Sequence, residues 1–450
     1  MRLYWLSVVP LVAAAIISIG RRQRVLAVGL SLATTLACAS LALLLPLNDV
    51  TFFLGQQWVL NQVAQTLLVF MYIATAILLT IEATTEQGES FCAPVLASVG
   101  LLSAVILLRS LLLSFLLLPA AMAVLVLATP PLAISAIRGA ARFLTWVTLP
   151  TLFVLAAFML LERFALFPDE LALANLSAWL MVPPVTLWLT LFPFHGTTRL
   201  WATDGLSLAP VFLWVVKDWI VIYLLLALWE QNPVLHMENA MITLGIAGLV
   251  TAVVSGVLAL AQSSPSAVLA CAAMSELGIA VQGMTADTGG LQGGLFLLVS
   301  RSVAVLLASS ALAAMYSTSV KDSKSNAKSF HWQSLALLIA FIVGVLSMAG
   351  IPPLGGFFGR RYIYALLQAK KPYLFLAWLS ASMGIVLGLV RTSWSLWHMR
   401  VQSTSRHIRD FPLFLVLCLL LLCLWIGFRP QAALGLISAL FGHWLPLSPL

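Results

Sequence analysis

Four ionisable side chains lie inside long apolar stretches of the sequence. They are Lys217, Asp218, Glu276 and Arg301. A charge near the centre of a bilayer costs roughly 2.5–3.5 kcal/mol on insertion scales, so each of these residues needs a partner or a function. A buried lysine or carboxyl group beside water can exchange protons, because burial disfavours its charged form. We therefore treat all four as candidates for an ion path.

Lys217 and Asp218 are neighbours in the sequence. Adjacent helix positions diverge by about 100°, so the two side chains are predicted not to face each other. Two interpretations stay open for Lys217: a proton-exchanging or helix-bridging group, or one half of a neutralised pair. Glu276 has no basic residue on its own helix, so it is protonated or paired across helices with Lys217 or Arg301. We expect Lys217 and Glu276 to point into the bundle.

Arg301 lies inside an apolar stretch, whereas the remaining polar or helix-breaking candidates lie at the ends or interruptions of such stretches. Arg301 suits an electrostatic gate, because its guanidinium keeps its proton. His195, at a helix end, is either a proton relay or a hydrogen-bonded interfacial residue. Two proline pairs predict that their helices kink or unwind locally, because proline lacks the N–H donor and clashes with the preceding turn. Each interruption either lines an ion site, as in many transporters, or is a packing kink. These pairs are Pro183–Pro184 and Pro352–Pro353, and Arg360 follows the second pair.

The composition shows which elements must position these residues. Of 450 residues, 62% are hydrophobic and only 8% are charged, against about 25% charged in soluble domains. In lipid every backbone polar group must be satisfied internally, which a helix achieves within one segment of about 20 apolar residues. We predict an all-α membrane protein of about fourteen transmembrane helices, forming one polytopic membrane domain over 1–450.

The predicted helices follow one another with short connections. They are 4–20, 25–46, 61–82, 91–108, 111–128, 139–161, 173–193, 209–228, 240–261, 266–284, 292–316, 333–349 continuing to 368, 374–398 and 411–428. The stretch 431–450 is interpreted as an interfacial tail.

The basic residues are scattered at helix ends, so the net charge of +8 reflects topology rather than nucleic-acid binding. One set of alternate loops contains twelve Lys and Arg residues and the other contains six. Cytoplasmic loops are the ones enriched in Lys and Arg. We therefore predict a multi-pass protein of the cell inner (cytoplasmic) membrane, surrounded by lipid, with both termini outside.

The cysteines predict no cofactor or metal. Five are present, on apolar segments, with no C-x-x-C pair and no histidine partner at ligand spacing. They read as small buried or lipid-facing residues. No iron–sulfur or zinc signature occurs, so any redox chemistry is expected in partner subunits.

Four segments, in order, resemble one family of membrane proteins. Residues 193–196 (PFHG) resemble the start of the motif VPLHGWLPDAH, and residues 261–278 resemble AQTDIKRLIAYSSISQLG. Residues 346–359 (LSMAGIPPLGGFFG) are similar to LSLAGIPPLAGFFG, and Arg391 matches the arginine of YYYLR. These motifs belong to the antiporter-like subunits of respiratory complex I, membrane-bound hydrogenases and multisubunit Na⁺/H⁺ antiporters. The resemblance covers about residues 100–400.

The resemblance implies fourteen helices with two inverted five-helix repeats, whose broken helices seven and twelve lie along a central axis of charged residues. This chain departs from that pattern. Aligning Pro119 with the fifth-helix proline of the family puts Ser114 where the family has glutamate. Trp188 lies near the position of the seventh-helix lysine. The half-channel near Ser114 and Trp188 is therefore predicted to be dry, because water needs two to four polar partners.

The second half of the axis is altered rather than lost. By resemblance, Lys217 is the eighth-helix lysine, Glu276 replaces Gln or His, and Arg301 replaces a histidine-containing segment. Arg360 stands where the twelfth helix has Lys or Glu. Either protons follow a changed route through Lys217, Glu276 and Arg360, or the subunit is a structural spacer. Arg360 favours the second reading, because arginine cannot cycle protons.

The resemblance implies an antiporter-like membrane subunit of a complex I-related or hydrogenase-type assembly that translocates protons or Na⁺, with a degenerate ion path. One alternative is a non-conducting scaffold of such a complex. Another is a membrane subunit of an ion-driven inorganic-carbon uptake complex. The expected partners are other membrane subunits, with a quinone-reducing or hydrogenase module at a distance. Whether the chain is part of an enzyme, such as an NADH:quinone oxidoreductase-like translocase, stays open.

Overall fold

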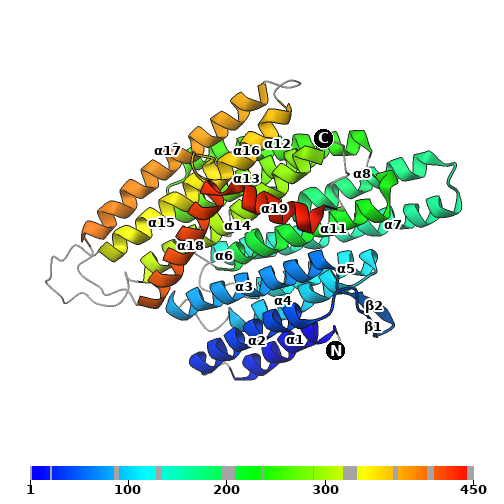
Figure 1. Cartoon of the computed structure of the whole chain (residues 1–450), viewed down its shortest axis with the longest axis horizontal. Coiled ribbons are helices and arrows are strands. Elements are labelled where there is room, and N and C mark those ends of the chain that lie inside the picture. The colour runs from blue at the N-terminus through cyan, green and yellow to red at the C-terminus, as the bar shows by residue number, and fades with distance from the viewer. Residues whose placement is uncertain are drawn as a thin grey trace. The chain divides into compact units, whose positions relative to one another are not determined.

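A computed structural model shows a protein built almost entirely of helices (Figure 1). It describes residues 3–20, 23–85, 91–127, 134–194, 208–235, 237–286, 288–317, 332–367, 373–402 and 410–442. The helices in the first half are α1 (Trp5–Ile19), α2 (Arg24–Leu44), α3 (Gln62–Thr85), α4 (Cys92–Leu107), α5 (Leu111–Val126), α6 (Ile134–Thr148), α7 (Pro150–Leu166), α8 (Leu171–Trp188), α10 (Leu208–Phe212), the π-helix η1 (Leu213–Lys217), α11 (Asp218–Gln231) and the 3₁₀-helix η2 (Pro233–Leu235). The helices in the second half are α12 (Glu238–Ala261), α13 (Pro265–Met284), α14 (Thr288–Ser317), α15 (Trp332–Ala349), α16 (Gly355–Leu367), α17 (Tyr373–Gln402), α18 (Asp410–Phe428) and α19 (Pro430–Phe441).

The predicted helical membrane architecture is confirmed. Within the described residues, nine helical stretches are long and apolar enough to cross a membrane, and a tenth span results if the bent pair α18–α19 is counted as one. Four shorter apolar helices accompany them: Trp5–Ile19, Cys92–Leu107, Leu111–Val126 and Gln333–Ala349. The count of fourteen spans stays a prediction. Where an interfacial tail was expected, α19 is a helix at 87° to α18.

A short hairpin that the sequence reading did not anticipate connects α2 to α3. Strand β1 (Val50–Phe53) pairs with β2 (Gln56–Val59) in antiparallel register. The turn between them contains Leu54 and Gly55, both at positive φ. Phe53 stacks on Tyr4, just before α1, with ring centroids 4.3 Å apart. The hairpin therefore closes one end of the helix group to which α1 belongs.

The chain folds into two compact units. The first, unit 1, comprises Met1–Ala83, Gln87–Thr190 and Ser207–Thr243. In it α1 packs against α4 and α2, α4 against α5, and α7 against α8. The hydroxyl of Tyr72 on α3 donates to the carbonyl of Leu6 on α1 at 2.6 Å and lies 2.7 Å from Ser103 Oγ on α4. These buried bonds, together with the one from Ser7 Oγ on α1 to the carbonyl of Gly100 on α4, help to fix the register of the three helices.

The second, unit 2, comprises Thr84–Glu86, Leu191–Leu206 and Leu244–Leu450. Its centre is α13, buried along its whole length, which packs against α14 (Figure 1). Small residues allow the helices to approach closely. A Cβ on Gly248 of α12 would lie 2.6 Å from the carbonyl oxygen of Gly278 on α13, and one on Gly256 would lie 2.5 Å from the Cα of Ala381 on α17. These contacts leave no room for larger side chains at Gly248 and Gly256 of α12.

The two predicted helix breaks have different outcomes. The break at Pro352 and Pro353 is confirmed, because α15 ends at Ala349 and α16 begins at Gly355. Gly350 supplies the positive φ of +75° that the chain needs after α15. Pro183 and Pro184 both lie inside α8, so this pair does not end the helix.

The interruption after α8 comes later in the chain than predicted. The helix ends at Trp188, and Thr190 then adopts a φ of 53°. A proline in a helix loses one backbone hydrogen bond, and the neighbouring turn can absorb the resulting kink.

Candidate ion-path sites

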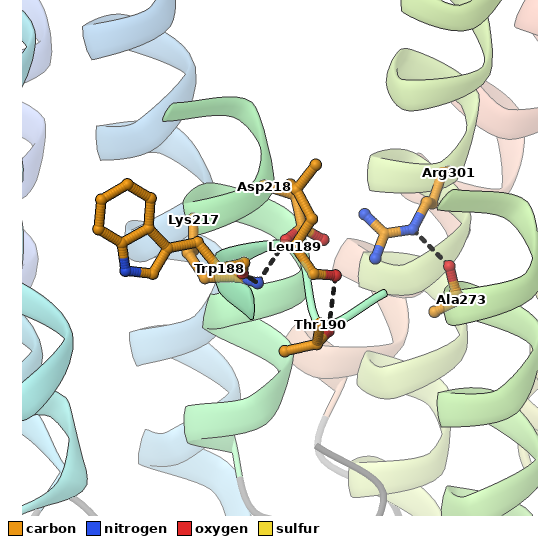
Figure 2. Close-up of polar contacts among 7 residues, drawn as sticks. All are labelled: Trp188, Leu189, Thr190, Lys217, Asp218, Ala273 and Arg301. Carbon is orange, nitrogen blue, oxygen red and sulfur yellow. Dashed lines mark hydrogen bonds and ion pairs between the residues drawn. The ribbon is translucent and has the colours of Figure 1, made fainter. Parts of the chain in front are cut away.

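Lys217 occupies the last position of a π-helical stretch, Leu213–Lys217, within a continuous span. Its side chain is 1% exposed, so the prediction that it points inward is confirmed. Its Nζ lies 2.6 Å from Oδ1 of Asp218 (Figure 2). The prediction that these two side chains do not face each other is therefore wrong. A π-turn alters the spacing expected from a regular α-helix, and the flexible four-carbon stem of lysine reaches the neighbouring carboxylate.

The same ammonium group also caps the end of α8. Lys217 Nζ donates a hydrogen bond to the carbonyl oxygen of Trp188, the last residue of that helix (Figure 2). The last carbonyls of a helix have no partner within the helix and carry a partial negative charge. Lys217 therefore joins η1 to the end of α8, and Asp218 and Trp188 both belong to unit 1.

Ser114 and Trp188, the two positions predicted to depart from the family pattern, are both completely buried. The indole of Trp188 is stacked on the ring of Phe115, the residue after Ser114. The ring centroids are 5.7 Å apart and the angle between the ring planes is 9°. Its Nε1 donates to the carbonyl of Val147 at 3.1 Å. The hydroxyl of Ser114 donates to the carbonyl of Ser110 at 3.2 Å, one turn earlier in its own helix. Both side chains therefore occupy an apolar, aromatic environment.

Glu276 lies on α13 in unit 2 and is completely buried, which confirms the prediction that it points inward. Neither carboxyl oxygen accepts a hydrogen bond from the part of the chain that the structure describes. A Cβ on Gly356 would lie 2.8 Å from Oε1 of Glu276, so the carboxyl group lies against the first turn of α16. That end of a helix carries a partial positive charge. Arg360 and Arg301 also attract the carboxyl group electrostatically.

Arg360, on α16, binds the end of α15 on the other side of the break. Its Nη1 donates to the carbonyl of Ala349 at 3.0 Å and to Ser382 Oγ at 2.6 Å. Its Nη2 donates to the carbonyl of Met348. Those carbonyls belong to the last turn of α15. Arg360 therefore caps the first half of the broken helix from a position in the second half.

Arg301 differs from Lys217 and Arg360 in the kind of carbonyl that it binds. Its Nε donates to the carbonyl of Ala273 at 2.7 Å, in the middle of α13 (Figure 2). That carbonyl is one turn before Leu277 in a regular helix, so it is not a terminal group. Arg301 is 1% exposed and joins α14 to α13 within three residues of Glu276. It provides a fixed positive charge beside that carboxyl group.

Two further residues concern the candidate ion path: His195, which the sequence predicted, and Glu82, which it did not. His195 lies outside the described residues. Glu82, near the end of α3, is 2% exposed, and the sequence reading missed it because the predicted helix ended at that residue. The facing residue Arg24, at the start of α2, could have indicated it. In the part of the chain that the structure describes, no cluster of three or more His, Cys, Asp or Glu side chains could hold a metal ion.

Comparison with known proteins places these sites in a family. A family described as NADH:quinone oxidoreductase/Mrp antiporter, TM, matches residues 103–387. The NADH-quinone oxidoreductase subunit N of Methylococcus capsulatus is 31% identical over 212 residues, covering 44% of this chain and 42% of the relative. Subunit N 2 of Acidobacterium capsulatum is 29% identical over 203 residues, covering 42% of this chain and 40% of the relative. The matched segment thus spans about two fifths of these curated relatives.

Solved structures share the fold over nearly the whole chain. A chain of the archaeal membrane-bound sulfane sulfur reductase aligns with a TM-score of 0.84 at 14% identity, covering 98% of this chain and 97% of the other. A chain of the Mrp complex from Dietzia sp. aligns with a TM-score of 0.77 at 14% identity, covering 99% of this chain and 97% of the other. A chain of respiratory complex I from Thermus thermophilus aligns with a TM-score of 0.73 at 19% identity, covering 98% of this chain and 99% of the other. At these identities the likeness establishes the fold, and the match over residues 103–387 establishes the relationship. The chain belongs to the NADH:quinone oxidoreductase/Mrp antiporter transmembrane family.

Proposed function

We propose that this chain is an antiporter-like membrane subunit of an ion-translocating complex, and that Glu276 is the ion-binding group of unit 2. The observation that carries the proposal is the state of its carboxyl group, which is buried and accepts no hydrogen bond from any described residue. A buried carboxylate without a bonded partner is costly, so the group takes up a proton or another cation readily. Such a group can load and unload an ion as its surroundings change.

The surroundings of Glu276 favour reversible loading. The first turn of α16 and the charges of Arg301 and Arg360 stabilise the ionised carboxylate, while burial favours the neutral form. These influences oppose each other, so a small movement at the break between α15 and α16 changes the balance. In many transporters the ion sites likewise lie at the breaks of discontinuous helices.

In this proposal Arg360 and Lys217 position the helices and do not carry the ion. A guanidinium stays protonated, and the guanidinium of Arg360 is bonded to carbonyls of the last turn of α15. Lys217 is held by Asp218 and by the last carbonyl of α8. Neither cation can move without releasing a helix end.

The expected assembly follows from the relatives. The similar chains come from the membrane-bound sulfane sulfur reductase, the Mrp complex and respiratory complex I, each of which is a complex. We therefore propose other membrane subunits as the partners of this chain, with redox chemistry elsewhere in the complex. A location in the cytoplasmic membrane with both termini outside agrees with the twelve-to-six distribution of basic residues between alternate loops.

A non-conducting scaffold is the second candidate, and a specific observation in unit 1 favours it. Trp188 and Phe115 fill the region where the family pattern has a charged pair. A stacked aromatic pair offers few partners for ordered water. If unit 2 were equally closed to ions, the subunit would support the complex without conducting.

The decisive experiment replaces Glu276 in the complete complex, reconstituted in vesicles, and measures ion pumping against redox turnover. Glu276→Gln keeps the volume and removes the ionisable group, and we expect pumping per turnover to fall at least about tenfold, which corresponds to about 1.4 kcal/mol. Glu276→Asp should retain part of the activity. Glu238→Gln, at an exposed position, serves as the control. Normal pumping by an assembled Glu276→Gln complex would favour the scaffold.

A further inference from the structure

Glu82 is a second buried carboxyl group, and it lies outside the segment that the family matches. Its side chain is 2% exposed, and neither carboxyl oxygen accepts a hydrogen bond from a described residue. It is located at the end of the span formed by Gln62–Ala83. Unlike Asp218, it has no lysine or arginine in ion-pair contact among the described residues.

The nearest cation does not satisfy this carboxyl group. Arg24, the first residue of α2, donates from its Nη2 to the backbone carbonyl of Glu82 at 3.0 Å. The guanidinium therefore acts on the carboxyl group through space and caps the end of α3 instead. Arg24 is itself partly exposed, so it marks the side on which this cluster reaches water.

Further polar groups continue from Glu82 into the helix group. Cys92 on α4 lies within electrostatic range of Glu82, and its thiol contacts the hydroxyl of Ser31 on α2. Cys92 and Ser31 are both buried. Arg24 and Cys92 are thus the titratable groups that face Glu82 from the neighbouring described helices.

We propose that Glu82 is a proton-binding site of unit 1, which exchanges its proton with water at the Arg24 end of α2. A proton is the cation that this site accepts with the fewest ligands, because a neutral carboxyl group is tolerated in an apolar setting, whereas a metal ion needs several oxygen ligands. The proposal is independent of Glu276, which belongs to unit 2. It gives unit 1 a titratable group although its Ser114 and Trp188 positions have none.

The first test uses the wild-type complex and a hydrophobic carbodiimide. This reagent takes the proton of a neutral carboxyl group onto its own nitrogen, while the carboxyl oxygen bonds to its central carbon. The adduct rearranges to a stable N-acylurea, and peptide mass spectrometry locates it. We expect adducts on Glu82 in acidic buffer and several-fold fewer in alkaline buffer, with the exposed Glu238 as an internal comparison.

The second test is infrared difference spectroscopy of the complex between acidic and alkaline buffer. Wild type should show the carbonyl stretch of a protonated carboxyl group, and Glu82→Gln should lose one such band while Glu276→Gln retains it. Unchanged spectra in Glu82→Gln, together with pH-independent labelling of wild type, would overturn the proposal. If Glu82→Gln fails to assemble, labelling of wild type alone decides: pH-dependent adducts support the site, and a lack of pH dependence refutes it.

Discussion

Units 1 and 2 each use a basic side chain to hold the end of a helix, but they treat the accompanying acid differently. In unit 1 Lys217 binds the last carbonyl of α8, and Asp218 lies 2.6 Å from its ammonium group. In unit 2 Arg360 binds the last carbonyls of α15, yet Glu276 accepts no hydrogen bond from a described residue. Asp218 is neutralised by its ion pair with Lys217, whereas the carboxyl group of Glu276 is available to bind an ion.

This difference separates structural charges from transport charges. A cation on a terminal carbonyl compensates the partial negative charge of a helix end, whether or not an ion ever moves. The same arrangement recurs at Arg391, whose guanidinium binds the carbonyl of Gln262 just after α12. Basic residues that hold helix ends, such as Lys217, Arg360 and Arg391, are therefore poor markers of an ion path, and the carboxyl groups that accept no hydrogen bond from a described residue are better ones.

The largest effect is expected from Lys217→Ala, which removes the cation from the closed pair. Asp218 then loses its ion-pair partner in a buried setting, which costs about 3–5 kcal/mol. The amount of assembled complex in membranes should fall sharply, while pumping per assembled complex changes little. The double variant Lys217→Met, Asp218→Leu should recover much of the assembly. A normal amount of assembled Lys217→Ala complex with a selective loss of pumping would show that unit 1 conducts.

Arg360→Lys should weaken the corresponding cap in unit 2. Lysine keeps the charge but cannot reproduce the guanidinium bonds to Met348, Ala349 and Ser382, so a loss of about 1.5–3 kcal/mol is expected. Thermal unfolding of the complex should shift downward, whereas pumping by the folded fraction should persist. Arg361→Lys, at the exposed neighbouring position, is the matched control. Pumping lost without any change in unfolding would make Arg360 part of the path.

Gly356→Ala tests the space beside the available acid. The added Cβ would overlap the carbonyl oxygen of Ser347 and lie 2.8 Å from Oε1 of Glu276. Overpacking of this kind typically costs about 1–3 kcal/mol, and pumping should decrease together with stability. Gly435→Ala, where no atom lies within 4 Å of the new Cβ, should change neither. Equal behaviour of the two variants would contradict a tight fit between α13 and α16.

The smallest effect is expected from Trp188→Phe in the aromatic cluster. Phenylalanine can keep the stacking on Phe115 but loses the hydrogen bond to Val147. A buried carbonyl without its donor costs about 1 kcal/mol, visible as a small decrease in unfolding temperature. Trp179→Phe, on the exposed side of α8, is the control. A gain of pumping in Trp188→Phe would mean that the indole blocks a path.

The sequence predicted the fold class well, because hydrophobic content and span length leave few alternatives in a bilayer. It also predicted the break at Pro352–Pro353, where glycines flank the prolines and permit a positive φ. Pro183 and Pro184 have no flanking glycines and lie inside α8, so this pair does not end the helix. The strained residue that does end this region, Thr190, has no sequence signal of its own.

The candidate site was predictable in its members but not in its pairings. Glu276 and Lys217 stood out as charges in apolar segments, and both are buried. The contact between Lys217 and Asp218 depends on a π-helical stretch, which periodicity does not reveal. Glu82 was missed because a charge at a predicted helix end is usually solvated, whereas here the side chain is buried by tertiary packing.

The hairpin between α2 and α3 offers a way to establish sidedness. Its turn residue Leu54 is 83% exposed, and the backbone there already adopts the conformation of a tight turn. The strands on either side are anchored, since Phe53 stacks on Tyr4 and Gln57 binds Arg109 at 2.7 Å. A cysteine introduced at Leu54 would place a reactive thiol at the exposed turn of an anchored hairpin. Its accessibility to a reagent that cannot cross the bilayer would then report which compartment the first connecting loop on that side faces.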